Sequence, residues 1–184
     1  MNTSLFLLIS ALSVTLHTKK PHPFFEGQSI MHACSGVFIQ ENKILTASHC
    51  VEKASHLWIK TDDNKSYKAT VIKLDEKKDL ALLYIHDIKH HNIAKAVNDY
   101  KKSDLIFQVS NADDMHQTYG TGMIMNIILD NKVEQLVHSA VILGGSSGSG
   151  LFDKRGRLIG INVARMGAVS FAVSSKEIEA FLNN

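Results

Sequence analysis

The chain has 184 residues, of which 45% are hydrophobic and 21% are charged. This composition fits one globular domain and excludes both a disordered chain and a protein with several membrane-spanning helices. The formal net charge of +2 is too small to indicate a nucleic-acid-binding surface, so no nucleic-acid partner is expected. Two cysteines are too few for a small disulfide-stapled scaffold, and they leave open either one disulfide or two free thiols.

The N-terminal segment is apolar from Leu5 to Leu16 and then turns basic. It is shorter than the roughly 20 residues of a membrane-spanning helix, and its length is typical of the apolar region of a secretory signal. We predict a signal peptide or short hydrophobic anchor over residues 1–20, with a buried strand or helix as the alternative. Residues 21–27 hold both prolines and are predicted to be a linker, so that the folded domain begins at residue 28. Membrane association is expected only through the N-terminal segment.

The rest of the chain consists of short apolar runs with turn residues between them. Examples of such runs are Val37–Ile39, Leu80–Ile85 and Leu158–Ala164. Short runs at regular spacing, without helical patterns of 10 to 15 residues between them, are typical of an all-β sandwich or barrel.

One short helix is expected at the C-terminal end. Ser174 and Glu177 form a capping box, and Ile178, Phe181 and Leu182 follow at helical spacing. We predict that this helix packs its apolar stripe onto the β-structure.

A glycine- and serine-rich run occupies residues 144–150, between two apolar strands. A flexible linker has no domains to join there, whereas a tight glycine turn directs several backbone N–H groups at one point, as an oxyanion hole requires. The pattern G-x-S-x-G would make Ser146 the nucleophile of an α/β-hydrolase, but that fold needs a histidine after the serine and the last histidine is His138. The other interpretation makes Ser147 the nucleophile, with its histidine and aspartate upstream.

Both upstream residues are present in suitable settings. His49 follows the apolar run Leu45–Ala47, and Asp79 opens the apolar run that continues to Leu83. A carboxylate at the edge of a buried strand is costly unless it is paired with a cation or an N–H group, and an imidazole is a suitable partner.

Four segments, in chain order, resemble the successive motifs of chymotrypsin-fold serine proteases: Ser35–Ile39, Leu45–Val51, Asp79–Leu82 and Gly145–Ser149. The likeness is greatest to compact HtrA-like and glutamyl-endopeptidase-like bacterial peptidases without a PDZ domain. It implies an all-β fold of two six-stranded antiparallel barrels with a short C-terminal helix. Within a protease domain over 28–184, the barrels are expected over 28–100 and 101–173, and the helix over 174–184.

The resemblance also implies a role for each residue of the site. His49 would take the proton of the Ser147 hydroxyl while Asp79 holds the imidazole, and the backbone N–H groups of Gly145 and Ser147 would form the oxyanion hole. The chain would then be a serine endopeptidase acting on protein or peptide substrates, without a metal or cofactor. The alternative is a protease-fold binding module with little or no catalytic activity.

The resemblance places the specificity pocket at Val141, Val163, Ala164 and Arg165. Val141 replaces the carboxylate that trypsin-like specificity needs, so cleavage after basic residues is not expected. Asn162 replaces the histidine of glutamyl endopeptidases, which disfavours acidic specificity, although Arg165 offers a positive charge. We therefore expect a small or medium aliphatic side chain in the pocket. Val163 also lacks the hydroxyl that supports the aspartate in many members of the family.

Cys34 and Cys50 match a pair that forms a disulfide beside the catalytic histidine in many members of this family. The alternatives are two reduced thiols, or a zinc site with His32 and His49 whose spacing departs from the usual motifs. Together with the apolar leader, a disulfide indicates a secreted, periplasmic or cell-envelope protein.

Overall fold

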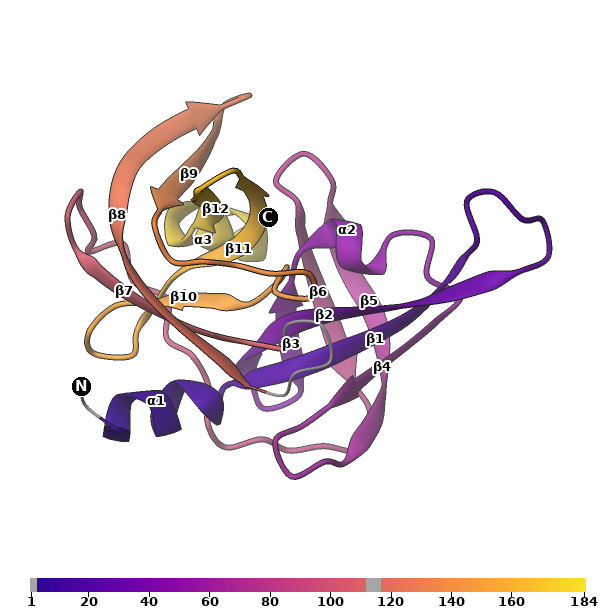
Figure 1. Cartoon of the computed structure of the whole chain (residues 1–184). Helices are drawn as coiled ribbons and strands as arrows, with labels where there is room; N and C mark the ends of the chain where they lie inside the picture. Colours follow the sequence, from indigo (N-terminus) through magenta and orange to yellow (C-terminus); the bar gives the residue numbers. More distant parts are fainter. Residues whose placement is uncertain (1–2, 112–116) are drawn as a thin grey trace.

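The computed structural model describes residues 3–111 and 117–184 of the protein, which form two β-barrels and three short helices (Figure 1). In chain order the elements are α1 (Thr3–Ser10), β1 (Ser13–Pro21), β2 (Ser29–Gln40), β3 (Lys43–Thr46), α2 (Ser48–Val51), β4 (His56–Lys60), β5 (Ser66–Asp75), β6 (Leu80–Ile85), β7 (Leu105–Ser110), β8 (Thr118–Asp130), β9 (Val133–His138), β10 (Gly150–Phe152), β11 (Leu158–Met166), β12 (Val169–Ser174) and α3 (Ser175–Asn183).

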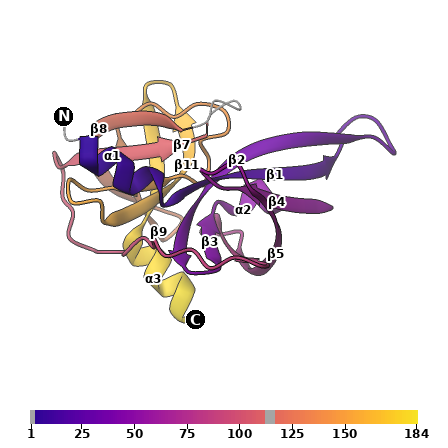
Figure 2. The same ribbon diagram turned by 90° about the horizontal axis from the view of Figure 1, so that it is seen from below.

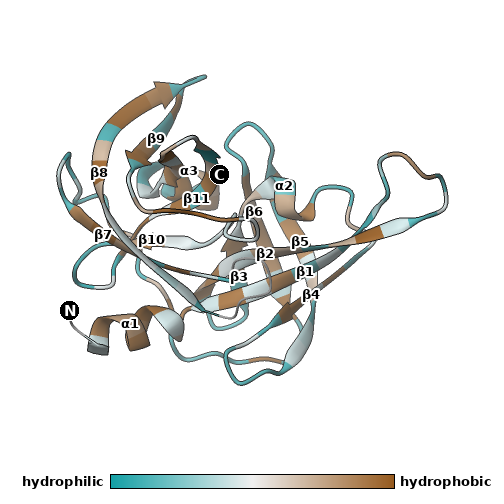
Figure 3. Cartoon of the chain, viewed as in Figure 1, coloured by the Kyte–Doolittle hydropathy of each residue, from teal (hydrophilic) through white to brown (hydrophobic). Residues whose placement is uncertain are grey.

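The first barrel closes in the strand order β1-β2-β3-β6-β5-β4, and the second in the order β10-β11-β12-β9-β8-β7. Figure 3 shows apolar residues along the strands of both barrels and mostly hydrophilic residues in the loops around them. The short apolar runs of the sequence fill the interiors, with Phe38 and Leu83 fully buried in the first barrel and Ile106 and Leu136 in the second. The predicted fold class, two six-stranded antiparallel barrels with a C-terminal helix, is confirmed.

The N-terminal boundary of the fold differs from the prediction. Strand β1 pairs with β2 from Ser13 opposite Val37 to Pro21 opposite Ser29, and on its other edge it pairs with β4. The first barrel therefore begins at β1 and not at residue 28. Residues 22–28 are the loop of the β1–β2 hairpin rather than a linker, and the hairpin extends beyond the barrel (Figures 1 and 2). An apolar run of this length suits a signal sequence and a buried strand equally well, and the structure has the helix and buried strand that we named as the alternative.

Helix α1 packs against the second barrel. The ring of Phe6 meets the rings of Phe107 and Tyr119 edge-on, with centroids 5.8 and 5.0 Å apart, and the Ser10 hydroxyl lies 2.9 Å from the Tyr119 hydroxyl. The N-terminal segment thus contacts both barrels, through α1 and β1. Within residues 3–111 and 117–184, no helix has the length and apolar character to cross a membrane. Cleavage of residues 1–20 as a signal peptide would remove β1 from the first barrel, so the fold favours the uncleaved hydrophobic anchor, and either role of the segment stays a prediction.

Helix α3 begins at the predicted cap. The Ser174 hydroxyl accepts a hydrogen bond from the Glu177 backbone N–H at 3.4 Å, and Ile178 and Phe181 are buried, whereas Leu182 stays 37% exposed. The predicted apolar stripe is therefore right at two of its three positions.

The second half of the predicted capping box is replaced by contacts to other elements. The Glu177 carboxylate accepts a hydrogen bond from the Glu134 backbone N–H at 3.2 Å and pairs with the Lys78 ammonium at 2.8 Å. Lys78 directly precedes Asp79, so this largely buried ion pair ties α3 of the second half to the turn that carries Asp79 in the first.

Candidate active site

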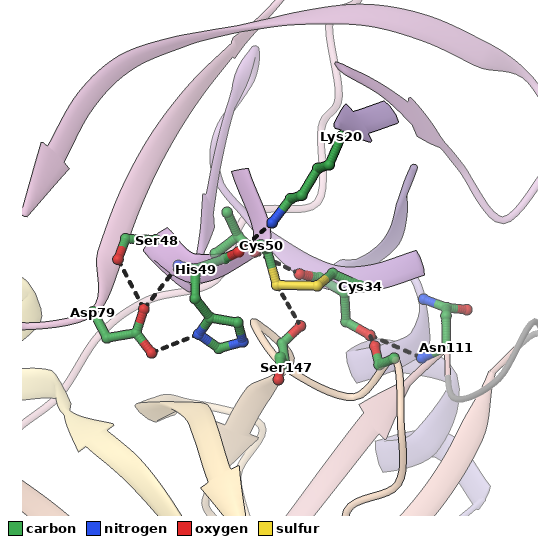
Figure 4. The surroundings of a disulfide bond; sticks show 11 residues. Lys20, Cys34, Ser48, His49, Cys50, Asp79, Asn111 and Ser147 are labelled. Carbon is green, nitrogen blue, oxygen red and sulfur yellow. Dashed lines mark hydrogen bonds and ion pairs between the residues drawn. A yellow bond between two sulfur atoms is a disulfide. The ribbon is translucent and has the colours of Figure 1, made fainter. Parts of the chain in front are cut away.

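The three predicted catalytic residues come from both barrels. His49 lies in the short helix α2, Asp79 directly precedes β6, and Ser147 lies in the turn between β9 and β10. Figure 4 shows the imidazole of His49 between the Asp79 carboxylate and Ser147, with its second ring nitrogen on the side of Ser147.

The Asp79 carboxylate is held by three hydrogen bonds. Its Oδ2 lies 2.7 Å from His49 Nδ1, and its Oδ1 accepts from the His49 backbone N–H at 3.0 Å and from the Ser48 hydroxyl at 2.8 Å. Burial opposes ionisation of this carboxyl, but the hydrogen bonds from His49 and Ser48 outweigh burial and hold its pKa below the ordinary value. The ionised carboxylate therefore fixes the imidazole with Nδ1 as a donor, which leaves Nε2 as the nitrogen that can accept a proton.

Ser48 is a contributor that sequence reasoning missed. Val163 lacks a supporting hydroxyl, as expected, and Ser48 supplies one from the opposite barrel at the start of α2. The sequence signal that could have identified Ser48 is its position directly before His49. In the first turn of α2, this position brings the Ser48 hydroxyl next to the Asp79 carboxylate that pairs with His49.

The backbone of Asp79 adopts a left-handed conformation with φ of 53°. This conformation costs a non-glycine residue about 1–2 kcal/mol. The three hydrogen bonds to its carboxylate and the adjacent Lys78–Glu177 ion pair hold the residue there.

The Gly145–Ser147 turn is fixed by Ser35 of β2. The Ser35 backbone N–H donates to the Ser147 carbonyl at 2.8 Å, and its hydroxyl donates to the Gly145 carbonyl at 2.9 Å. Among the residues that the structure describes, the backbone N–H groups of Gly145 and Ser147 have no hydrogen-bond partner. With their carbonyls tied to the first barrel, both N–H groups are available to a ligand atom, as the predicted oxyanion hole requires.

Gly148 allows the turn to approach the first barrel this closely. Its φ is +85°, and a Cβ at this position would lie 2.2 Å from both the Ser35 carbonyl oxygen and the Thr46 hydroxyl. No larger residue fits, so the glycine sets the distance between the serine turn and the strands that precede His49.

The two adjacent serines of the turn have different surroundings. Ser146 is 1% exposed, and its hydroxyl accepts from the Leu143 backbone N–H at 3.1 Å and donates to the Ser110 hydroxyl at 3.0 Å. The Ser147 hydroxyl is partly exposed and has no protein hydrogen-bond partner within the described ranges. These surroundings suit Ser146 to a structural role and leave Ser147 free to react.

A disulfide joins Cys34 of β2 to Cys50 of α2, directly beside His49, with the two Cα atoms 6.2 Å apart. The two cysteines are 16 residues apart in the sequence. A bridge that closes a loop of that length stabilises a fold by about 3 kcal/mol in the loop-entropy model. Because both sulfurs are in the bridge, neither is a thiolate that could bind zinc. On the other side of α2, the Lys20 ammonium of β1 donates to the His49 carbonyl at 2.5 Å, and burial lowers the pKa of this lysine.

A cavity of about 290 Å³ opens beside Ser147. Besides Ser147, its lining consists of Ile142, Leu143, Gly144, Ala164 and Arg165.

The predicted specificity pocket is therefore revised at two of its four positions. Ala164 and Arg165 line the cavity, but Val141 points to solvent with 63% exposure and Val163 is buried in β11, and neither belongs to the lining. The other wall of the cavity is formed by Ile142, Leu143 and Gly144, which directly follow Val141.

The profile of the trypsin-like peptidase domain matches residues 34–161, which is more than half of the chain. The chain belongs to the trypsin-like peptidase family. The match covers His49, Asp79 and Ser147 and continues into β11.

Curated relatives of this trypsin-like peptidase include serine protease HTRA1 of Xenopus tropicalis, 27% identical over 87% of the chain and 37% of the relative. The periplasmic serine endoprotease DegP of Salmonella typhimurium is 26% identical over 83% of the chain and 35% of the relative. The chain thus spans little more than a third of the length of these relatives. A solved HtrA-type protease, AlgW with a decapeptide, shares the fold with a TM-score of 0.86 and 21% identity, over 98% of this chain and 66% of that one.

Behind the cavity, this trypsin-like peptidase has a buried polar network centred on Asn162. The Asn162 side-chain amide donates to Gln108 at 2.8 Å and to the Ser149 hydroxyl at 2.9 Å, so its oxygen accepts from His138 Nε2, at 2.9 Å. Gln108 in turn donates to the Val141 carbonyl at 2.7 Å. The network thus connects the serine turn to the segment that leads into the cavity wall.

His138 is fully buried in this network. Burial lowers its pKa to about 4, against the opposing effect of its hydrogen bond to Asn162, so the ring is neutral at pH 7. In this neutral ring the proton is on Nε2, which donates the hydrogen bond to the Asn162 side-chain oxygen.

Proposed function

We propose that this trypsin-like peptidase is a serine endopeptidase, with Ser147 as nucleophile, His49 as general base and Asp79 as the group that orients the imidazole. The observation that carries the proposal is the pairing of His49 with an anchored Asp79, opposite Ser147. Among the described residues, the Ser147 hydroxyl and the backbone N–H groups of Gly145 and Ser147 have no hydrogen-bond partner. The family assignment and the serine proteases among the relatives support the same activity.

In the proposed mechanism, His49 Nε2 takes the proton of the Ser147 hydroxyl as its oxygen attacks the peptide carbonyl. Asp79 stabilises the imidazolium that forms, and the proton then passes to the leaving amine. The N–H groups of Gly145 and Ser147 stabilise the negative oxygen of the tetrahedral intermediate, and each donor of this kind contributes about 10²- to 10³-fold to the rate. Water then hydrolyses the acyl-enzyme by the same route in reverse.

The substrates are proteins or peptides whose residue before the scissile bond is not basic. Among the residues that the structure describes, no carboxylate lines the cavity beside Ser147 that would pair with a lysine or arginine side chain. The decapeptide named with the AlgW structure is consistent with a peptide substrate for this fold.

The protein acts outside the cytosol, in the periplasm, the cell envelope or the medium. The disulfide beside His49 supports this location, because such bonds form and persist in oxidising compartments. The periplasmic DegP relative points the same way. Membrane contact, if any, runs through the N-terminal segment.

The test is hydrolysis of an unfolded protein substrate, followed by mass spectrometry of the products. Ser147→Ala should lower kcat by on the order of 10⁶, as removal of a triad serine does. Ser146→Ala is the matched control, and it should keep measurable turnover because its hydroxyl only braces the turn. Equal activity of wild type and Ser147→Ala would contradict the proposal. An inactive wild type that still binds the substrate would favour the protease-fold binding module.

A further inference from the structure

Among the residues that the structure describes, Arg165 is the one charged side chain that lines the cavity beside Ser147. It is exposed on β11, and its Nη1 donates to the Ile142 carbonyl on the opposite wall at 3.2 Å. Within the described residues no carboxylate lies within ion-pair distance of this guanidinium, whereas Arg157 has two such partners. Among the described residues, Arg165 is therefore a positive charge without an ion-pair partner at the edge of the site.

The remaining lining is neutral. Ile142 and Leu143 are apolar, Gly144 presents backbone, and Ala164 is small enough to leave space next to the guanidinium. A side chain that fills the cavity covers the guanidinium and removes water from it. Covering an unpaired cation is costly, unless the incoming group supplies a negative charge.

The guanidinium also keeps hydrogen-bond donors for an anion. Its bond to the Ile142 carbonyl spans the two walls and uses one of five N–H groups, so others remain to bind a carboxylate through two parallel hydrogen bonds. A cation held in place in this way loses less side-chain entropy on binding than a free surface arginine does.

Asn162 does not contribute to the recognition of a negative charge in the cavity. It is fully buried, and its side chain is occupied by Gln108, Ser149 and His138. Recognition of charge in the cavity therefore falls to Arg165 alone.

We propose that Arg165 makes this cavity a specificity pocket for acidic side chains, so that cleavage follows glutamate or aspartate. The inference rests on the proposed endopeptidase function and replaces the aliphatic preference expected from Val141 and Asn162. Neither of these residues lines the described cavity that would have to hold an aliphatic side chain.

The experiment compares matched peptides that differ only at the residue before the scissile bond, namely Glu, Gln, Asp, Asn, Val and Lys. Wild type should cleave the Glu peptide with a kcat/KM about 10- to 100-fold above that of its Gln isostere, as a charge-assisted hydrogen bond predicts. Arg165→Ala should bring this ratio close to one, and Arg165→Lys should retain part of it because a point charge remains. Arg155→Ala, which removes a cation from the exposed β10–β11 turn, should leave the ratio unchanged.

A neutral fluorophosphonate separates failure of the pocket proposal from failure of the enzyme proposal. Arg165→Ala should be labelled at the wild-type rate, because the serine turn is intact. If wild type is labelled but cleaves the Val peptide as well as the Glu peptide, or if Arg165→Ala keeps the Glu/Gln ratio, acidic specificity is overturned alone. If wild type is neither labelled nor active on any peptide, the endopeptidase proposal fails and the pocket proposal fails with it.

Discussion

Both barrels have six antiparallel strands, but the polar groups that they contribute to the candidate active site differ in their hydrogen bonding. In the first barrel the polar groups of the site are satisfied internally, since Asp79 accepts three hydrogen bonds and a disulfide fixes α2 to β2. In the second barrel the serine turn leaves the N–H groups of Gly145 and Ser147 without protein partners in the described parts of the chain. The comparison teaches that the half of the site proposed to transfer the proton is fixed by internal hydrogen bonds, whereas the half proposed to bind the substrate keeps two backbone donors unpaired among the described residues.

Two sets of contacts fix the two halves of the site relative to each other. Ser35 of the first barrel holds the serine turn of the second, and Glu177 of α3 holds Lys78 beside Asp79. Each half of the molecule therefore helps to position a predicted catalytic residue of the other half.

The largest expected effect comes from removing the strand that closes the first barrel. A variant lacking residues 3–21 loses β1, exposes the edges of β2 and β4, and should fail to fold. A variant lacking residues 3–11 keeps β1 and loses only α1, so it should fold with reduced stability. Circular dichroism and limited proteolysis distinguish the two results. A folded, active protein that begins at residue 22 would show that β1 is dispensable.

The second expected effect concerns the buried network of the second barrel. His138 has a pKa of about 4 in the folded protein and an ordinary value near 6.5 when unfolded, so the unfolded state binds more protons between these values. The free energy of unfolding should therefore fall by roughly 3 kcal/mol in total, mostly as the pH drops from 6.5 to 4, and should level off below about pH 3.

Urea unfolding of wild type and His138→Gln between pH 4.5 and 7.5 measures this contribution. Glutamine can still donate to Asn162 but does not titrate, so the stability difference between the two proteins should depend on pH in this window. The lowered pKa values of Asp79 and Glu177 act at more acidic pH in both proteins and cancel in the difference. A pH-independent difference would mean that His138 is not buried as a neutral ring.

The smallest expected effect concerns the hydrogen bonds that hold Asp79 in the first barrel. Ser48→Ala removes one of three hydrogen bonds to Asp79 and should lower kcat about tenfold, with little change in KM because Ser48 does not line the substrate cavity. Ser66→Ala, on the exposed start of β5, is the control and should have no effect. A rise in KM at constant kcat would place Ser48 in substrate binding instead.

Local sequence patterns predicted a large part of the fold. The apolar runs at regular spacing indicated β-structure, and the Ser174 cap marked the start of α3. The order of the motifs around His49, Asp79 and Ser147 indicated the arrangement in which the structure brings these residues together.

What could not be predicted depends on contacts between distant parts of the chain. Pairing of β1 with β4 joins residues about 40 positions apart, so hydropathy alone did not separate a barrel strand from a signal sequence. The Ser35 hydroxyl acts across the two barrels and nothing local marks it, whereas Ser48 could have been found from its position directly before His49. The direction in which Val141 points follows from the turn after it and is invisible in the residue type.

The most direct test of the account is the site at which a fluorophosphonate reacts. Intact and peptide-level mass spectrometry should locate a single adduct on Ser147, and the adduct should be absent from Ser147→Ala and greatly slowed in His49→Ala. An adduct on Ser146, or no adduct on the intact wild-type protein, would contradict the assignment of Ser147 as the activated nucleophile between the two barrels.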